Sequence, residues 1–150
     1  MRLYPNFLPA IEDEPQPSDF AVEQIDDQRG EGVIALRTFA PGDVLFRMNG
    51  IPMTEITQHT LQLAPEVHLH DPWVAGKVLH SCAPNSRLDV ETQYYVAVRP
   101  IAPGDLLTMD YDETEDVLYR AFECRCGAPQ CRGFIAGRKV PVAATQDALT

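Results

Sequence analysis

The sequence predicts a mostly β fold, and three observations support this class. Pro–Gly pairs punctuate the chain at Pro41 and Pro103, as they do in turns between strands. Helical spacing of apolar residues is convincing only from about 112 to 122. β-branched and aromatic residues gather in short runs that are typical of strands, at 20–25, 33–37, 44–48 and 93–99.

Size and charge limit the classes of function. A chain of 150 residues with 45% hydrophobic residues predicts a single domain with a real core. Its net charge of −10 would be repelled by nucleic-acid phosphates, so we expect no nucleic-acid partner. The charge fits either a basic partner, such as a lysine-rich peptide, or simply a soluble acidic surface.

Residues 1–19 are expected to form an extended arm, because four prolines and several acidic residues disfavour regular structure there. The N-terminus lacks the continuous apolar run of a secretory signal. No window holds the roughly 18 apolar residues of a membrane helix. We therefore expect a cytoplasmic protein without a membrane partner, in a compartment where thiols stay reduced.

The four predicted strand segments include an internal similarity. Residues 35–46 resemble residues 97–108, and in both a Pro–Gly pair follows an alanine and precedes an aspartate. Proline fixes φ at the second position of a type II turn, and glycine accepts the positive φ of the third. We expect two turn units of similar shape.

The predicted helix follows the second unit. Residues 112–115 resemble a capping box, in which the residue three places after the N-cap is acidic. Apolar residues at 117, 118 and 121 would then form one helical face, ending by residue 122.

The cysteines predict a metal site. Cys124, Cys126 and Cys131 form a C-x-C-x₄-C cluster, and Cys82 is the one other cysteine in the sequence. A C-x-C pair is too close to form an unstrained disulfide, whereas four thiolates suit a closed tetrahedral zinc site. The alternative is four buried, reduced cysteines that act as small apolar side chains.

Two histidines raise the alternative of a second metal site. His68 and His70 alternate on an apparent strand, so both imidazoles would share one face. No suitably spaced acidic residue follows them, since Asp71 is directly adjacent. Two strand histidines without a metal are the simpler interpretation.

Four segments together resemble the SET-domain family of S-adenosylmethionine-dependent protein-lysine methyltransferases. They are the glycine-rich 29–33, the His-Ser-Cys-Ala-Pro-Asn run at 80–85, the strand end at 105–111 and the post-SET-like 124–133. The resemblance implies small β-clip-like sheets with a C-terminal pseudoknot, in which the segment after Tyr111 passes beneath the loop 80–85. It also implies a zinc site completed by Cys82. The expected divisions are an arm at 1–19, a SET domain at 20–121, a post-SET segment at 122–137 and a tail at 138–150.

The resemblance assigns roles to individual residues. Tyr111 is the expected catalytic residue, whose hydroxyl would orient the methyl donor and the acceptor amine. The expected zinc ligands are Cys82, Cys124, Cys126 and Cys131. Residues expected to bind S-adenosylmethionine are Gly30, Glu31, Gly32, Leu79, His80 and Phe122. Tyr94, Tyr95 and Met109 are expected at the substrate channel, although adjacent strand residues face opposite ways, so at most one of the two tyrosines would line it. Asn85 is expected to secure the knot by hydrogen bonds.

Two departures from the family pattern leave alternatives open. Leu79 stands where the family has an asparagine that helps bind the amino group of the donor. The segment 52–78, which shapes substrate recognition in the family, is short. The principal prediction is methyl transfer to a lysine of a protein or peptide. The alternatives are a SET module that binds a cofactor or partner without turnover, and an enzyme with a small-molecule acceptor.

Overall fold

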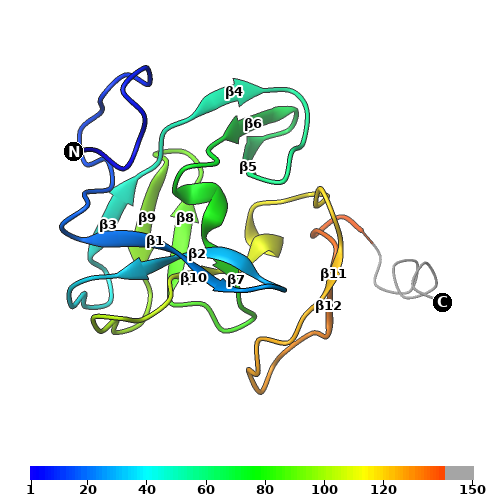
Figure 1. The fold of residues 1–150 in the computed structure, drawn as a ribbon. Helices are drawn as coiled ribbons and strands as arrows, with labels where there is room; N and C mark the ends of the chain where they lie inside the picture. Colours follow the sequence, from blue (N-terminus) through cyan, green and yellow to red (C-terminus); the bar gives the residue numbers. More distant parts are fainter. Residues whose placement is uncertain (141–150) are drawn as a thin grey trace.

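The structure is a computed structural model that describes residues 1–140, and it is built from five small sheets (Figure 1). Two 3₁₀ helices accompany the strands: η1 (Ala75–Lys77) and η2 (Tyr111–Glu113). The strands are β1 (Phe20–Asp26), β2 (Gly30–Ala35), β3 (Val44–Arg47), β4 (Ile51–Met53), β5 (Thr60–Ala64), β6 (Val67–His70), β7 (Leu79–His80), β8 (Ser86–Asp89), β9 (Tyr94–Ala97), β10 (Thr108–Met109), β11 (Phe122–Glu123) and β12 (Phe134–Ile135). The mostly β prediction is confirmed. Neither helix is long and apolar enough to cross a membrane.

Every strand pairing within residues 1–140 is antiparallel except one. β1 pairs with β2, β11 pairs with β12, and two three-stranded sheets have the orders β3-β9-β8 and β4-β6-β5. The exception is β7, which pairs in parallel with β10 although nearly thirty residues separate them. This pairing places the loop after β7 against the chain that leads into η2, as the predicted knot requires.

The repeated Pro–Gly units pair with each other in a reciprocal way. Gly42 N donates to Ala97 O at 2.8 Å, and Gly104 N donates to Ala35 O at the same distance. Both glycines have a positive φ, 92° and 90°, so the two predicted turns are confirmed. The internal similarity therefore reflects an approximate two-fold relation between the units.

The helix predicted from 112 to 122 is wrong. Only the single turn η2 forms. It begins one residue earlier than predicted because the N-cap residue is Asp110 rather than Asp112: the Asp110 side chain accepts a hydrogen bond from Asp112 N. Beyond it, Gln62 N of β5 donates to the Glu115 carboxylate at 2.9 Å. Leu118 N donates to Ala136 O. Distant segments thus form hydrogen bonds with backbone and side-chain groups that a longer helix would have used for its own hydrogen bonds and cap.

The N-terminal segment is extended and packs against the domain. Tyr4 and Leu8 belong to the main core, with 2% and 5% of their surface exposed. The Tyr4 hydroxyl donates to the buried carboxylate of Asp71 at 2.6 Å, and this carboxylate also accepts from the backbone before η1.

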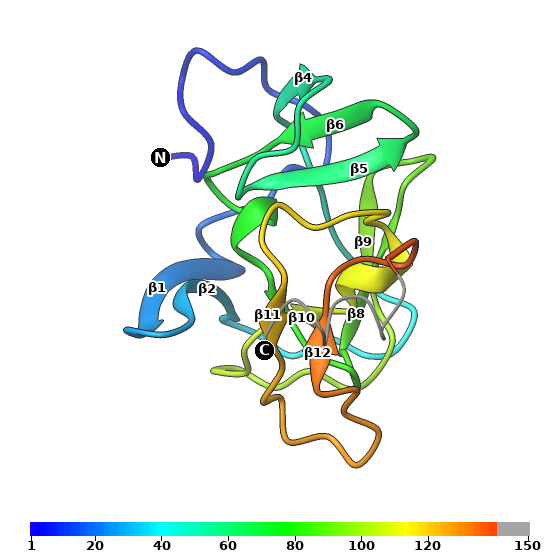
Figure 2. The same cartoon turned by 90° about the vertical axis from the view of Figure 1, so that its right-hand side faces the viewer.

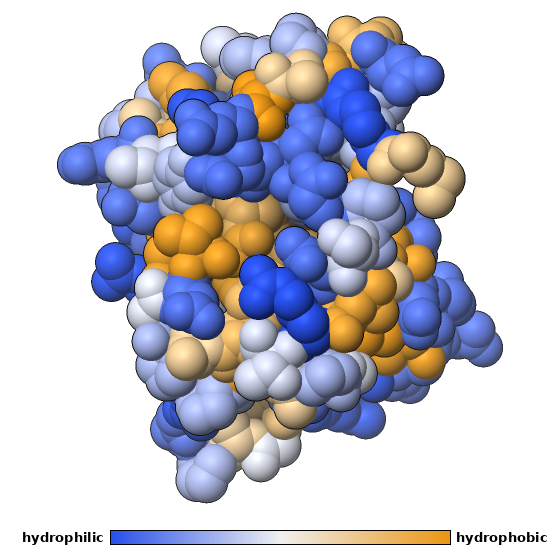
Figure 3. Space-filling model, turned by 90° about the vertical axis from the view of Figure 1, so that its left-hand side faces the viewer, coloured by the Kyte–Doolittle hydropathy of each residue, from blue (hydrophilic) through white to orange (hydrophobic). Residues whose placement is uncertain are grey.

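The face seen in Figure 3 is mostly hydrophilic, with separate apolar patches between polar side chains.

The C-terminal segment lies along one side of the domain. β11 and β12 form a separate pair on one side of the molecule (Figure 1 and Figure 2), and the ring of Phe122 in β11 packs against that of His80 in β7 with centroids 5.6 Å apart. Arg138 anchors the end of this segment, because its backbone N donates to Glu115 O and its guanidinium pairs with Asp116 at 2.7 Å. Of the tail expected at 138–150, residues 141–150 lie outside the described residues.

Candidate active site

The four cysteines come together at the junction of the C-terminal segment and the β7 loop. Their sulfur atoms lie within 4.8 Å of one another, and Cys82 Sγ is 3.9 Å from Cys124 Sγ. A tetrahedral site with Zn–S bonds of about 2.3 Å separates its sulfurs by about 3.8 Å. The donor set and its spacing therefore fit a structural zinc ion, as the sequence predicts.

The surrounding backbone helps to hold these sulfurs. Arg132 N donates to Cys82 Sγ at 3.5 Å, and Cys124 N donates to the carbonyl of Gly133, which has a φ of 80°. Burial opposes ionisation of Cys126, but hydrogen bonds from backbone N–H groups lower the pKa of this thiol to about 6. Thiolate is the form that binds zinc.

A cavity of about 1130 Å³ opens beside the cysteine cluster. It is bounded by the β1–β2 turn, the segment before β5, η1, β7, η2 and the start of the C-terminal segment. Most of the residues assigned to the donor or to catalysis line it, namely Gly30, Glu31, Leu79, His80, Phe122 and Tyr111. The structure thus brings together segments that are up to ninety residues apart.

Gly32 is the exception among the residues assigned to donor binding. It is absent from the cavity lining, and a Cβ atom there would come within 2.8 Å of Leu106 Cδ1 and 2.9 Å of Ile25 Cγ1. Its lack of a side chain allows the β1–β2 hairpin to pack against the strand that leads to β10. Gly30, in contrast, lies in the lining and has a φ of 74°, which favours glycine.

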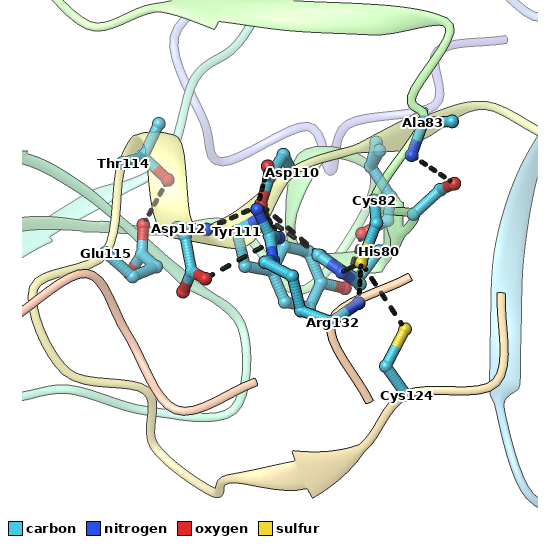
Figure 4. A network of polar contacts seen from close by, with 12 residues as sticks. His80, Cys82, Ala83, Asp110, Tyr111, Asp112, Thr114, Glu115, Cys124 and Arg132 are labelled. Atoms are coloured by element: carbon cyan, nitrogen blue, oxygen red, sulfur yellow. Dashed lines mark hydrogen bonds and ion pairs between the residues drawn. The ribbon is translucent and has the colours of Figure 1, made fainter. Parts of the chain in front are cut away.

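His80 connects the cysteine cluster to the cavity (Figure 4). Its Nδ1 accepts a hydrogen bond from Tyr111 N at 3.1 Å, and its Nε2 lies 3.4 Å from Cys82 Sγ. Burial lowers the pKa of His80 to about 4, against the opposing effect of Asp110. The imidazole is therefore neutral, and we assign its proton to Nε2, facing the sulfur, because Nδ1 is an acceptor.

Tyr111 lies at the centre of an aromatic group in the cavity wall. Its ring centroid is 5.1 Å from that of His80 and 6.0 Å from that of Phe122. Its hydroxyl donates to Val78 O at 2.7 Å, which leaves the phenol oxygen free to accept a hydrogen bond from a ligand. Burial, with a contribution from Glu115, raises the pKa of Tyr111, so the group is a neutral phenol.

The three residues assigned to the substrate channel are not in the cavity lining. Tyr94 donates from its hydroxyl to Asp13 of the N-terminal segment at 2.8 Å. Tyr95 points the opposite way into the core, is fully buried, and donates to Met109 Sδ at 3.4 Å. The opposite facing of the two tyrosines follows the alternation of a strand, and the structure places Tyr94 with the N-terminal segment instead of the cavity.

Asn85 ties the β7 loop to the strand before η2, as predicted. Its Nδ2 donates to Leu106 O at 2.9 Å, and its Oδ1 accepts from Thr108 N at the same distance.

The two histidines of β6 lie in different environments. His68 is buried, and His70 Nδ1 meets the Thr57 hydroxyl at 2.8 Å. Among residues 1–140, neither histidine belongs to a group arranged to hold a metal.

Sequence reasoning missed the ion pair that fastens the cysteine loop to η2. The Arg132 guanidinium meets both oxygens of Asp110, at 2.9 and 2.6 Å (Figure 4). Arginine one place after a cysteine ligand carries no distinctive signal by itself, and its partner is twenty-two residues away. This bidentate contact holds the zinc loop over the segment that carries Tyr111.

Replacing Arg132 with lysine tests that contact. Lysine keeps the charge but cannot make two parallel hydrogen bonds to one carboxylate, so the loop is held less firmly. We expect S-adenosylhomocysteine to bind several-fold more weakly, with the zinc content unchanged, as measured by calorimetry and elemental analysis. Arg37→Lys, at an exposed arginine that pairs with Asp19 outside the cavity lining, is the matched control. Equal affinity in the wild type and Arg132→Lys would remove the role assigned to this ion pair.

Comparison with known proteins gives related sequences and structures. No protein-family model matches the chain. It is 33% identical over 102 residues to "Methyltransferase flvH" of Aspergillus flavus, covering 65% of this chain and 57% of that protein. It is 36% identical over 67 residues to the histone-lysine N-methyltransferase ash1 of Drosophila melanogaster, covering 41% of this chain but 3% of that protein. The chain thus spans less than two thirds of either relative.

Solved structures agree with these relatives. KRYPTONITE in complex with mCHG DNA and SAH (S-adenosylhomocysteine) matches with a TM-score of 0.61 and 22% identity, over 77% of this chain and 29% of that one. KRYPTONITE in complex with mCHH DNA, an H3(1–15) peptide and SAH matches with a TM-score of 0.60 and the same identity and coverage. These likenesses show the fold.

Proposed function

Because this chain resembles SET-domain methyltransferases in sequence and fold and gathers a post-SET-type cysteine cluster, we propose that it is an S-adenosylmethionine-dependent methyltransferase that acts on a lysine side chain of a protein. The observation that carries the proposal is the arrangement of Tyr111, His80, Phe122 and the β1–β2 turn around one cavity. Two relatives named as methyltransferases and two structural matches that contain SAH support it.

The methyl donor supplies a methyl group on a positively charged sulfur. In the transfer, the carbon–sulfur bond breaks as a bond forms between that carbon and the acceptor nitrogen, in line with the leaving sulfur. Sulfur keeps the bonding electron pair, and the positive charge moves to nitrogen. The amine must already have released its proton to water, because a protonated amine has no lone pair.

The residues of the cavity suit this reaction in two ways. The Tyr111 hydroxyl is fixed by Val78 O, so its oxygen is held in one place for orienting the reacting groups. The aromatic rings of Tyr111 and Phe122 exclude water on this side, and low polarity beside a positive sulfur lowers the pKa of an amine. Neither step calls for a separate strong base.

Leu79 bears on the alternative of a module without turnover. Its side chain lines the cavity and has no group to hydrogen-bond the donor. Calorimetric titration of the zinc-loaded protein with S-adenosylmethionine and S-adenosylhomocysteine separates the two functions. Binding of both is expected, whereas no binding of either would leave only a partner-binding module.

The size of the cavity favours a second candidate acceptor, a small amine. At about 1130 Å³ it exceeds the roughly 300–1,000 Å³ of ordinary ligand sites, so there is room for an acceptor beside the donor. Incubation with a donor labelled in its methyl group, offered an H3(1–15) peptide, a mixed protein pool or a pool of small amines, separates these acceptors. Label in protein or peptide supports the lysine proposal, and label in the small-amine pool alone supports the second candidate.

A further inference from the structure

Glu115 places a buried carboxylate in the wall of the cavity that contains Tyr111. The residue is only 4% exposed, yet it belongs to the cavity lining. Figure 4 shows it on one side of Tyr111, with His80 and Cys82 on the other. An acid in this position has no part in the function proposed above.

The carboxylate is held in place through one of its two oxygens. Oε2 accepts from Gln62 N at 2.9 Å and from the Thr114 hydroxyl at 2.6 Å. The backbone is fixed as well, because Glu115 N donates to Tyr111 O at 2.9 Å. Oε1 accepts no hydrogen bond from any side chain or backbone group of residues 1–140.

No basic side chain within residues 1–140 forms an ion pair with this carboxylate. The nearby Arg138 and Lys139 both pair with Asp116 instead, at 2.7 and 3.4 Å. Burial raises the pKa of Glu115, and the hydrogen bonds from Gln62 N and the Thr114 hydroxyl, with a smaller effect of the charge on Arg138, oppose that rise. A buried carboxylate without a directly paired cation is costly, so the position favours a ligand that brings a positive charge.

We propose that Glu115 binds the protonated amine of the incoming methyl acceptor beside Tyr111, and so restricts the acceptor to amines that are protonated in water; the bound amine then releases its proton to water before the methyl group is transferred. This inference rests on the proposed function and adds a residue that selects the substrate. It also fits the direction of charge movement. As the methyl group is transferred, positive charge leaves sulfur and develops on nitrogen, where a fixed carboxylate stabilises it.

Glu115→Gln tests the proposal with little change in shape. The glutamine oxygen still accepts from Gln62 N and Thr114, so the fold and zinc content are expected to persist. The probe is n-butylammonium, which has the end of a lysine side chain, and n-butanol is its uncharged counterpart. Binding to the zinc-loaded protein is followed by NMR titration, with and without S-adenosylhomocysteine.

We expect the Glu115→Gln variant to bind n-butylammonium at least tenfold more weakly than the wild type, with n-butanol unaffected. Glu113→Gln is the matched control, because Glu113 is exposed and lies two residues away outside the cavity lining. This control should bind n-butylammonium like the wild type.

Three results would overturn the assignment. One is equal binding of n-butylammonium by the wild type and Glu115→Gln, and another is no saturable binding of n-butylammonium by the wild type. The third is a Glu115→Gln variant that loses affinity for S-adenosylmethionine alone, because the carboxylate would then bind the positively charged donor and not the acceptor. Failure of the proposed function looks different. The wild type would then bind neither S-adenosylmethionine nor S-adenosylhomocysteine, while the amine titration could still be read.

Discussion

Tyr111→Phe is expected to reduce methyl transfer to a small residual rate while leaving the zinc content and the affinity for S-adenosylhomocysteine nearly unchanged. The substitution removes only the hydroxyl, which is held by Val78 O at the cavity wall. Losing one oriented polar group at a reacting centre typically lowers the rate by about 10²–10³-fold. Single-turnover rates with labelled donor, together with calorimetry, measure the two effects separately.

Some loss of stability is expected in the same variant, because the buried carbonyl of Val78 loses its donor. An unsatisfied buried group costs about 1–3 kcal/mol. Tyr4→Phe is the control, since it also removes a buried hydroxyl with a short hydrogen bond, here to Asp71, in another part of the core. Tyr4→Phe should lose stability yet keep its turnover well below its melting temperature. A fully active Tyr111→Phe enzyme would refute the catalytic role.

Cys126→Ser is expected to remove stoichiometric zinc and to weaken S-adenosylhomocysteine binding by more than tenfold. Zinc binding to four thiolates contributes about 10 kcal/mol or more in small zinc domains, and a serine hydroxyl does not replace a thiolate ligand. The ion would join Cys82, after β7, to three cysteines of the C-terminal segment, and this segment contributes Phe122 to the cavity. Without the metal, that wall of the cavity is no longer held.

Elemental analysis, thermal melting and calorimetry check this prediction together. Treatment of the wild type with a chelator should reproduce the variant, because both remove the same constraint. Gln130→Ser changes an exposed residue between Cys126 and Cys131, and this variant should bind zinc and S-adenosylhomocysteine like the wild type. If Cys126→Ser binds S-adenosylhomocysteine as tightly as the wild type, the C-terminal segment does not close the cavity.

Much of this architecture was predictable from local sequence. Strands β1, β2, β3 and β9 overlap the four segments predicted from β-branched and aromatic residues, and the two Pro–Gly turns followed from the φ angles that proline and glycine adopt. The cysteine cluster was predictable for a different reason. Three thiols in eight residues have few structural uses, so spacing and chemistry alone indicated a zinc site, and Cys82 was the one ligand left to complete it.

The helix predicted at 112–122 failed because its polar residues find partners in distant strands. Glu115 looked like part of a capping box at a solvated helix start, yet it is buried against Gln62 of β5. The pairing of Arg132 with Asp110 was likewise invisible, since nothing local shows which acid a surface arginine will meet.

The sequence by itself thus determined four strand segments, the two Pro–Gly turns, the four candidate zinc ligands and the family resemblance that singled out Tyr111. The tertiary structure alone decided that Tyr94 turns away from the cavity, that His80 spans from a cysteine to Tyr111, and that Glu115 is a buried acid without an ion-pair partner among residues 1–140. The reason is physical. Backbone preferences act within a few residues, whereas burial and charge pairing depend on which distant segments the fold packs together.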